Sequence, residues 1–159
     1  MNTCRKDLKR QRGIATLEMA LVTPFLLVMM LVSFEFTRVF MDFNTLTKSV
    51  RDAARYAADD AFDGAGNIET GILANAKNLA VYGNINGVGD PVLVGFDIGD
   101  VTIVQLDQGT APAVREHFQA TATYTFRPLS PVLNGMGFLS QNFDMEFDLV
   151  ARSTMRALQ

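Results

Sequence analysis

The chain has 159 residues, a formal net charge of −3 and 48% hydrophobic residues, which is the size of one modest domain and unusually apolar for a soluble one. A single Cys excludes an internal disulfide framework, and a single His excludes a zinc site built on several histidines. After residue 13 the sequence holds nine basic and 16 acidic residues, which argues against a nucleic-acid binder with a broadly basic surface.

The first 13 residues are a short basic segment. They carry a charge of +4, because five basic side chains stand beside one acid, Asp7; the bases are Arg5, Lys6, Lys9, Arg10 and Arg12. Positive charge directly before an apolar segment predicts that the N-terminus lies in the cytoplasm and that the remainder of the chain lies outside it.

Residues 14–34 are an apolar run of 21 residues whose only ionisable side chain is Glu18. As a helix the run would be about 31 Å long, close to the thickness of a bilayer core, and this predicts a single transmembrane helix. A secretory signal peptide is the first alternative, but its apolar core is normally shorter and ends at a cleavage site of small residues. Pro24 has no N–H and predicts a kink about halfway along the run.

Glu18 needs a reason to be in this run. A carboxylate costs about 2.5–3.5 kcal/mol at the bilayer centre by insertion scales, and less near an edge. One interpretation is that Glu18, near the start of the run, reaches the headgroups or is protonated. The other is functional, because Glu18 is the fifth residue after Gly13, and a glycine offers a protease an unhindered backbone.

Several features of the first 58 residues occur together as one pattern. A basic leader ends at Gly13, and Glu18 and Pro24 follow within the apolar run. The sequence Glu-Phe-Thr-Arg stands at 35–38, and Arg-Asp-Ala-Ala-Arg-Tyr-Ala-Ala at 51–58. In this arrangement the segment resembles type IV prepilins, and specifically the TadE-like (TadE/TadF) minor pilins of the Tad, or Flp, tight-adherence pilus system.

The resemblance implies a processing step and a set of partners. It implies cleavage between Gly13 and Ile14 by a prepilin peptidase, after which Glu18 would face the new N-terminal amine of a subunit and set axial register in a filament. The implied partners are the prepilin peptidase, the major pilin, a second minor pilin, the inner-membrane assembly platform and membrane lipid, with no nucleic acid. The implied location is the inner membrane, with a periplasmic head and possible incorporation in an adhesive pilus that supports biofilm formation.

Residues 35–61 have the periodicity of an amphipathic helix. Apolar residues recur three or four positions apart, at Phe36, Val39, Phe40, Phe43, Leu46, Val50, Ala53, Ala54, Ala57 and Ala61. The transmembrane helix is therefore expected to continue as one rod to Ala61. The apolar stripe is expected to dock on the protein's own C-terminal part, with a partner protein as the alternative.

Residues 62–159 predict a periplasmic α+β head. A helix is expected over 68–82, then loops over 83–100 with a short strand near 92–96. Strands are expected over 101–106, 118–127 and 143–152, the last two from strict alternation of apolar and polar residues. They form a small antiparallel sheet whose apolar face is covered by the two helices.

The connection at 128–142 is long and contains both turn-forming and apolar residues. Its apolar side chains are expected either to close one end of the sheet or to bind another subunit, which makes them candidate partner-binding residues. They are Leu129, Val132, Leu133, Met136, Phe138 and Leu139.

The sequence contains no recognisable catalytic or cofactor motif. His117 has no evident nucleophile beside it and is expected to face solvent, and neither a phosphate-binding loop nor a dinucleotide motif is present. Asp59 and Asp63 fit two positions of a calcium loop, but Ala61 and Thr70 break the pattern. We therefore expect no enzyme, no cofactor and no metal.

Taken together, these features favour a minor pilin, with segments 1–13 (leader), 14–34 (transmembrane), 35–61 (amphipathic helix) and 62–159 (head). Two alternatives stay open: a pseudopilin of a secretion system, and an uncleaved single-pass anchor for a periplasmic binding or assembly module.

Overall fold

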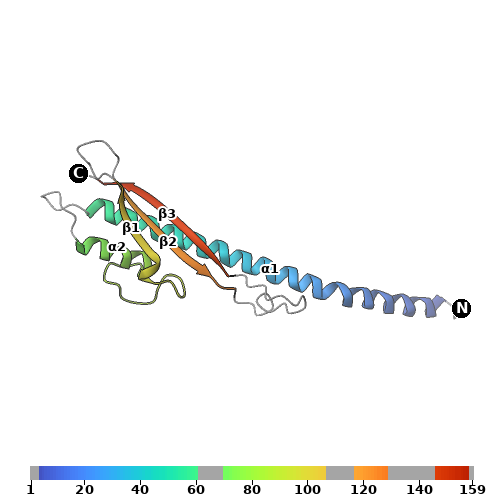
Figure 1. Ribbon diagram of the computed structural model, residues 1–159. Helices are drawn as coiled ribbons and strands as arrows, with labels where there is room; N and C mark the ends of the chain where they lie inside the picture. The colour runs from blue at the N-terminus through green and yellow to red at the C-terminus, as the bar shows by residue number, and fades with distance from the viewer. Residues whose placement is uncertain (1–3, 61–69, 107–116, 129–145, 158–159) are drawn as a thin grey trace. The chain divides into compact units, whose positions relative to one another are not determined.

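A computed structural model describes residues 4–60, 70–106, 117–128 and 146–157, with side chains over 13–59, 71–106, 117–128 and 146–157. The chain divides into two compact units. One contains Met1–Arg38 and Pro128–Asp144, and the other contains Val39–Arg127 and Met145–Gln159. The α+β description holds, because two helices and a three-stranded antiparallel sheet are present (Figure 1).

Helix α1 runs without interruption over Cys4–Asp60, which confirms the expected long helix. It passes through Pro24, so that residue does not end it, and the kink itself stays a prediction. Polar side chains along α1 donate to the carbonyl four residues before them: Thr23 to Met19 at 2.7 Å, Ser33 to Met29 and Thr37 to Ser33 both at 2.9 Å. These hydroxyl groups are therefore satisfied within the helix and need no water.

Helix α2 covers Thr70–Tyr82, which confirms the predicted second helix. It ends at Gly83, whose φ of +69° is the left-handed conformation that glycine adopts at helix C-termini. The Gly83 N–H donates to the Leu79 carbonyl at 3.0 Å and so satisfies one of the free carbonyls of the last turn.

The strand predicted over residues 92–96 is wrong, because this segment forms a tight turn. The Phe96 N–H donates to the Leu93 carbonyl at 3.1 Å, and Gly95 has a φ of +84°. Glycine at this third position is typical of a type II turn. Leu93 and Phe96 are both buried, so the apolar character that suggested a strand serves to anchor a loop.

The sheet has the strand order β1-β2-β3, with both pairs antiparallel. Strand β1 is Val101–Leu106, β2 is His117–Phe126 and β3 is Phe147–Arg156. Strand β1 has the predicted bounds, and β2 begins and ends one residue before the predicted 118–127. The predicted third strand over 143–152 is misplaced, since Glu146 is outside β3 and residues 143–145 lie outside the described residues. The strand instead extends to Arg156, where backbone pairing with β2 continues although the side chains are mostly polar.

The inner face of the sheet forms the core of the second unit. Phe118, Ala120, Ala122, Tyr124 and Phe126 are all buried, as their alternation predicts. They pack with residues of both helices and of the neighbouring strands: Leu46, Val50, Ala53, Ala54, Ala57, Ala76, Ala80, Val81, Val101, Leu149 and Ala151. The predicted docking of the α1 stripe on the protein's own head is thus confirmed from Leu46 onward.

The same stripe is not covered throughout. Phe36, Phe40 and Phe43 are exposed, in contrast to Leu46 and Val50. The expected docking on the protein's own C-terminal part is therefore confirmed for the C-terminal part of the stripe, and a partner protein stays the alternative for Phe36, Phe40 and Phe43.

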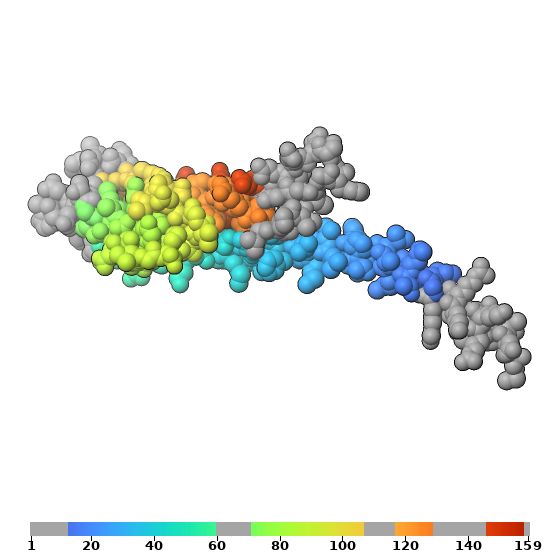
Figure 2. Space-filling view, turned by 90° about the horizontal axis from the view of Figure 1, so that it is seen from below, coloured from blue at the N-terminus to red at the C-terminus, as the bar shows by residue number. Residues whose placement is uncertain are grey.

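The loop between α2 and β1 lies beside α2 and forms part of the same surface (Figure 2). Its Val92 N–H donates to the Val81 carbonyl at 2.8 Å, which ties the loop to the end of α2. A short 3₁₀ turn, η1, over Ile98–Asp100 leads into β1. This turn has a reciprocal cap, because the Asp97 side chain accepts from the Asp100 N–H while the Asp100 side chain accepts from the Asp97 N–H at 2.9 Å; Asp97 Oδ1 also accepts from the Ile98 N–H at 2.6 Å.

The outer face of the sheet is polar and rich in threonine. Residues paired across the strands include Thr102 with Thr121 and Thr121 with Arg152. His117 is on this face but is half-buried, so the expectation that it faces solvent is only partly right. Its Nδ1 atom is buried without a hydrogen-bond partner among the described residues.

Candidate functional site

The N-terminal part of α1 carries the candidate functional residues. Among the described residues, one helix is long and apolar enough to cross a membrane; it covers Gly13–Asp59 and its most apolar window is not buried in the protein. Large apolar side chains along it are exposed, including Leu21, Phe25 and Met30. A long apolar N-terminal helix with an uncovered surface is compatible with a membrane anchor.

Gly13 lies inside α1 and has no structural reason to be a glycine. A Cβ at this position would meet no atom within 4 Å, and the backbone does not have the positive φ that favours glycine. Glycine inside a helix costs about 1 kcal/mol relative to alanine. Neither packing nor backbone conformation in the described structure explains why residue 13 is glycine. A contact with another molecule could explain it.

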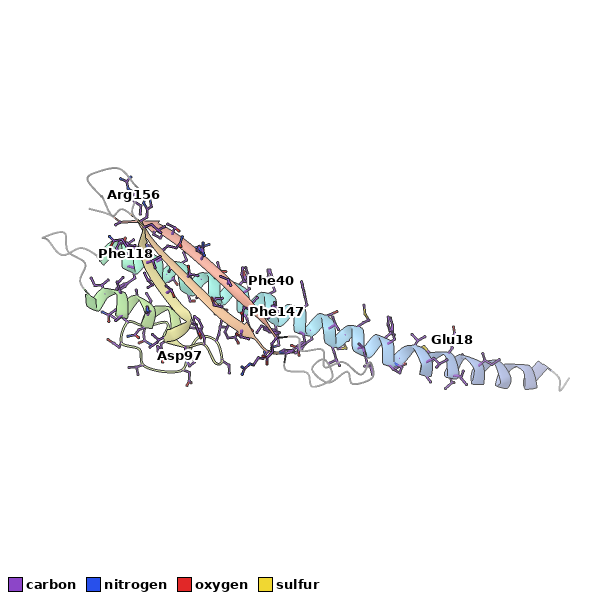
Figure 3. The ribbon with its side chains drawn as sticks, viewed as in Figure 1. Glu18, Phe40, Asp97, Phe118, Phe147 and Arg156 are labelled. Carbon is purple, nitrogen blue, oxygen red and sulfur yellow. The ribbon has the colours of Figure 1, made fainter. Side chains whose placement is uncertain are left out.

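Ile14 and Glu18 occupy one face of α1. They are four residues apart, which places them one helical turn from each other on the same side. Both side chains are exposed, and Glu18 projects away from the helix (Figure 3). Among the side chains that the structure describes, no ion pair involves Glu18.

Pro24 lies six residues after Glu18 in the same exposed segment. Because it has no N–H, the carbonyl of Ala20 loses its usual donor within the helix. The preceding residue, Thr23, donates its hydroxyl to Met19, one carbonyl earlier. Gly13, Ile14, Glu18 and Pro24 thus lie along one continuous helix, spaced along its axis, and do not converge on a pocket.

The structure also joins the two ends of the Glu-Phe-Thr-Arg sequence at 35–38 in an ion pair, which was not predicted. Arg38 Nη1 lies 3.1 Å from Glu35 Oε2, and Glu35 is only 6% exposed. Their spacing of three residues is the signal that could have indicated the pair. Both residues also make interactions besides this contact. Burial of a carboxylate is unfavourable unless it is paired, and Arg38 supplies the opposite charge for Glu35.

The remaining candidate residues are not brought into a site by the described structure. Leu129, Val132, Leu133, Met136, Phe138 and Leu139 lie outside the described residues. Of the two calcium candidates, Asp59 pairs with Arg55 at 3.6 Å and Asp63 lies outside the described residues. Within the described part of the chain, no group of three or more His, Cys, Asp or Glu residues is arranged to hold a metal ion.

Comparison with protein families gives a match in the N-terminal part of the chain. Residues 13–55 match the family described as TadE-like protein. No curated protein and no solved structure matches the chain significantly. The matched segment contains Gly13, Ile14, Glu18, Pro24 and the Glu35–Arg38 pair, and it includes the exposed apolar part of α1. Through this N-terminal segment the chain is similar to TadE-like proteins, and the similarity suggests involvement in a Tad pilus system.

Proposed function

We propose that the chain is a minor pilin, processed by a prepilin peptidase and acting in assembly of an adhesive pilus of the Flp/Tad type. The observation that carries the proposal is Gly13, a helical glycine with open space around it and no conformational need to be glycine, directly before an apolar run that contains Glu18. The match of residues 13–55 to TadE-like proteins supports it.

Processing explains why glycine is kept at position 13. A peptidase has to bind the backbone on both sides of the bond that it cuts, and a residue without a side chain leaves that backbone accessible. Cleavage after Gly13 would remove the basic leader and leave Ile14 as the new N-terminus, with a positively charged amine at the start of the apolar segment.

Glu18 then acts as a register charge. A carboxylate in an apolar surround is unfavourable alone, but it is stabilised by an opposite charge. The N-terminal amine of a neighbouring subunit supplies such a charge. Subunits whose helices slide relative to one another would lose this pair, so Glu18 favours one axial position between neighbours.

The head acts in recognition rather than catalysis. Its partners are the major pilin, a second minor pilin and the inner-membrane assembly platform.

Several aromatic residues of α1 before Leu46 are exposed, among them Phe36 and Phe40, and they are available to lipid or to neighbouring helices. This arrangement supports a structural subunit for adherence and biofilm formation.

The test is the intact mass and the N-terminal residue of the protein from cells with and without the prepilin peptidase. We expect a peptidase-dependent start at Ile14 and its loss in Gly13→Trp. Gly71→Trp is the matched control, because Gly71 is also a helical glycine with no atom within 4 Å of a Cβ. It should leave processing unchanged.

The alternatives give different results in the same measurement. A full-length chain in both cells would overturn the proposal and favour an uncleaved anchor for a periplasmic module. Cleavage at Ile14 together with co-purification of a secretion apparatus would favour a secretion-system pseudopilin. A processed Glu18→Gln variant that fails to assemble would separate the register role of Glu18 from recognition by the peptidase.

A further inference from the structure

The loop over residues 83–100, which we call the acidic loop, has a fixed conformation. Leu93 and Phe96 anchor it in the core, and the Phe96 ring packs edge-on against Tyr124 with centroids 6.2 Å apart. The Tyr124 hydroxyl donates to the Val94 carbonyl at 3.2 Å. Asn84 closes the other end, donating to the Val88 carbonyl at 2.6 Å and accepting from the Val88 N–H at 3.1 Å.

This fixed loop exposes aliphatic side chains. Val94, at the tip of the Leu93–Phe96 turn, is 93% exposed, and Val88 is 71% exposed. Three further aliphatic side chains of the loop are exposed to a smaller extent: Ile85, Val92 and Ile98. Single exposed apolar residues are common, but this loop exposes five, and its hydrogen bonds lower the conformational entropy that would be lost when a partner buries them.

The charge of the acidic loop has one sign. Asp90, Asp97 and Asp100 are exposed, and the sequence contains no Lys or Arg between residues 83 and 106. This charge disfavours an anionic lipid surface or a nucleic acid as the ligand. It favours a protein surface that is partly apolar and basic.

The outer face of the sheet, although mostly polar and rich in threonine, also carries exposed aliphatic and basic side chains. Val104 and Leu106 of β1 and Val150 of β3 are exposed on it, and β3 also contributes Arg152 and Arg156. Its acidic residue among the described strands, Asp148, accepts a hydrogen bond from Thr125 at 2.7 Å. The labelled Arg156 and Asp97 come from different elements of the head (Figure 3).

We propose that the acidic loop of one copy of this chain docks on the outer sheet face of a second copy. The two surfaces are distinct, because the loop is anchored among inner-face residues such as Tyr124, whereas Val104 and Val150 are on the opposite face. A contact between two different surfaces is heterologous and repeats from copy to copy, giving a chain of subunits rather than a closed pair. This inference rests on the proposed pilin function in that the copies share a membrane and an orientation.

The test is cysteine cross-linking of the full-length protein in membranes, in a Cys4→Ser background. Val94→Cys is combined with Val104→Cys or with Val150→Cys, all at exposed positions. We expect a ladder of oxidised products from at least one double variant, a dimer from a mixture of the two single variants and no product from Val94→Cys alone. Val94→Cys with Arg55→Cys, an exposed position on α1, is the matched control and should give no ladder.

Charge exchange tests the electrostatic part. Asp90→Arg in the cross-linking variant should lower the yield of ladder by about tenfold at low salt, and adding Arg152→Asp should restore it. Asp90 is chosen because Asp97 and Asp100 cap η1, and their loss would change the loop itself.

Each other result overturns the proposal. Dimers from Val94→Cys alone would indicate contact between two acidic loops. A cross-linked band that contains a different protein would assign the loop to that partner. Absence of a ladder from both double variants would exclude the contact. The N-terminal residue of the same samples separates this inference from the proposed function. A start at Ile14 without a ladder would contradict only the contact between copies. An uncleaved chain with a ladder would contradict only the processing.

Discussion

The two parts of α1 share one backbone helix but differ in what surrounds their side chains. Before Leu46 most of the large apolar residues are exposed, with Phe36 at 73%, although Val39 packs against the core. From Leu46 to Ala58 the inward apolar residues are buried, with exposed fractions of 2% or less, and most of them are alanine. The first part has large apolar side chains that the described part of the chain leaves exposed, whereas the second part is covered by the protein's own sheet.

The size of the side chains follows from this difference. The core contains alanines at 53, 54, 57 and 58 of α1 and at 120, 122 and 151 of the sheet, and we expect these small side chains to allow a close approach of helix and sheet. A lipid-facing helix has no such constraint, since lipid chains adapt to any apolar shape. Replacing an alanine by a larger apolar residue should therefore destabilise the head from Leu46 onward and be tolerated in the N-terminal part of α1.

The largest expected effect is on a buried phenylalanine. Phe118→Ala removes a fully buried ring and should lower the free energy of unfolding of the head by about 3–5 kcal/mol. Phe36→Ala removes a ring that is exposed, and it should leave that free energy unchanged within about 0.5 kcal/mol. Urea titration of the detergent-solubilised chain, followed by tyrosine fluorescence, measures both. Equal effects of the two variants would remove the distinction between the two parts of α1.

The next largest effect is expected on membrane insertion of residues 14–34. Leu26→Lys places a charge in the middle of the segment that we expect to cross the membrane, at an insertion cost of about 2.5–3.5 kcal/mol. Phe40→Lys places the same charge at an exposed position after this segment and should be tolerated. Carbonate extraction of membranes compares the two. If Phe40→Lys is extracted as readily as Leu26→Lys, the membrane-embedded segment extends beyond residue 34.

Much of the head could be predicted because its strands alternate strictly. Every second residue from Phe118 to Phe126 is apolar, and each of them is buried. The short run at 92–96 gave a wrong prediction because apolar residues also anchor turns, and only Gly95 with its positive φ distinguishes the two cases. The end of β3 was missed because Ser153 and Thr154 are polar, while strand pairing depends on backbone groups that no side-chain pattern reports.

The candidate site could be predicted only as a linear pattern. Gly13, Glu18 and Pro24 were found from charge and hydropathy, and the structure places all three on one helix. The burial of Glu35 beside Arg38 could not be predicted from spacing alone, since an exposed pair would have the same sequence. The exposed apolar surface of the acidic loop was missed because a Gly-rich loop is expected to be solvated, and burial of Leu93 next to exposure of Val94 depends on tertiary contacts.

The smallest effect tests the alanines directly. Ala54→Leu adds volume at a fully buried helix position facing the sheet, which forces side chains or backbone to shift and should destabilise the head by about 1–3 kcal/mol. Ala20→Leu makes the same change at an exposed position of the apolar part, where a larger apolar side chain extends into free space, and it should leave the free energy of unfolding unchanged. The same urea titration applies to both variants. A stable Ala54→Leu head would mean that the helix can move away from the sheet without loss, and the alanines would then need an explanation other than close packing.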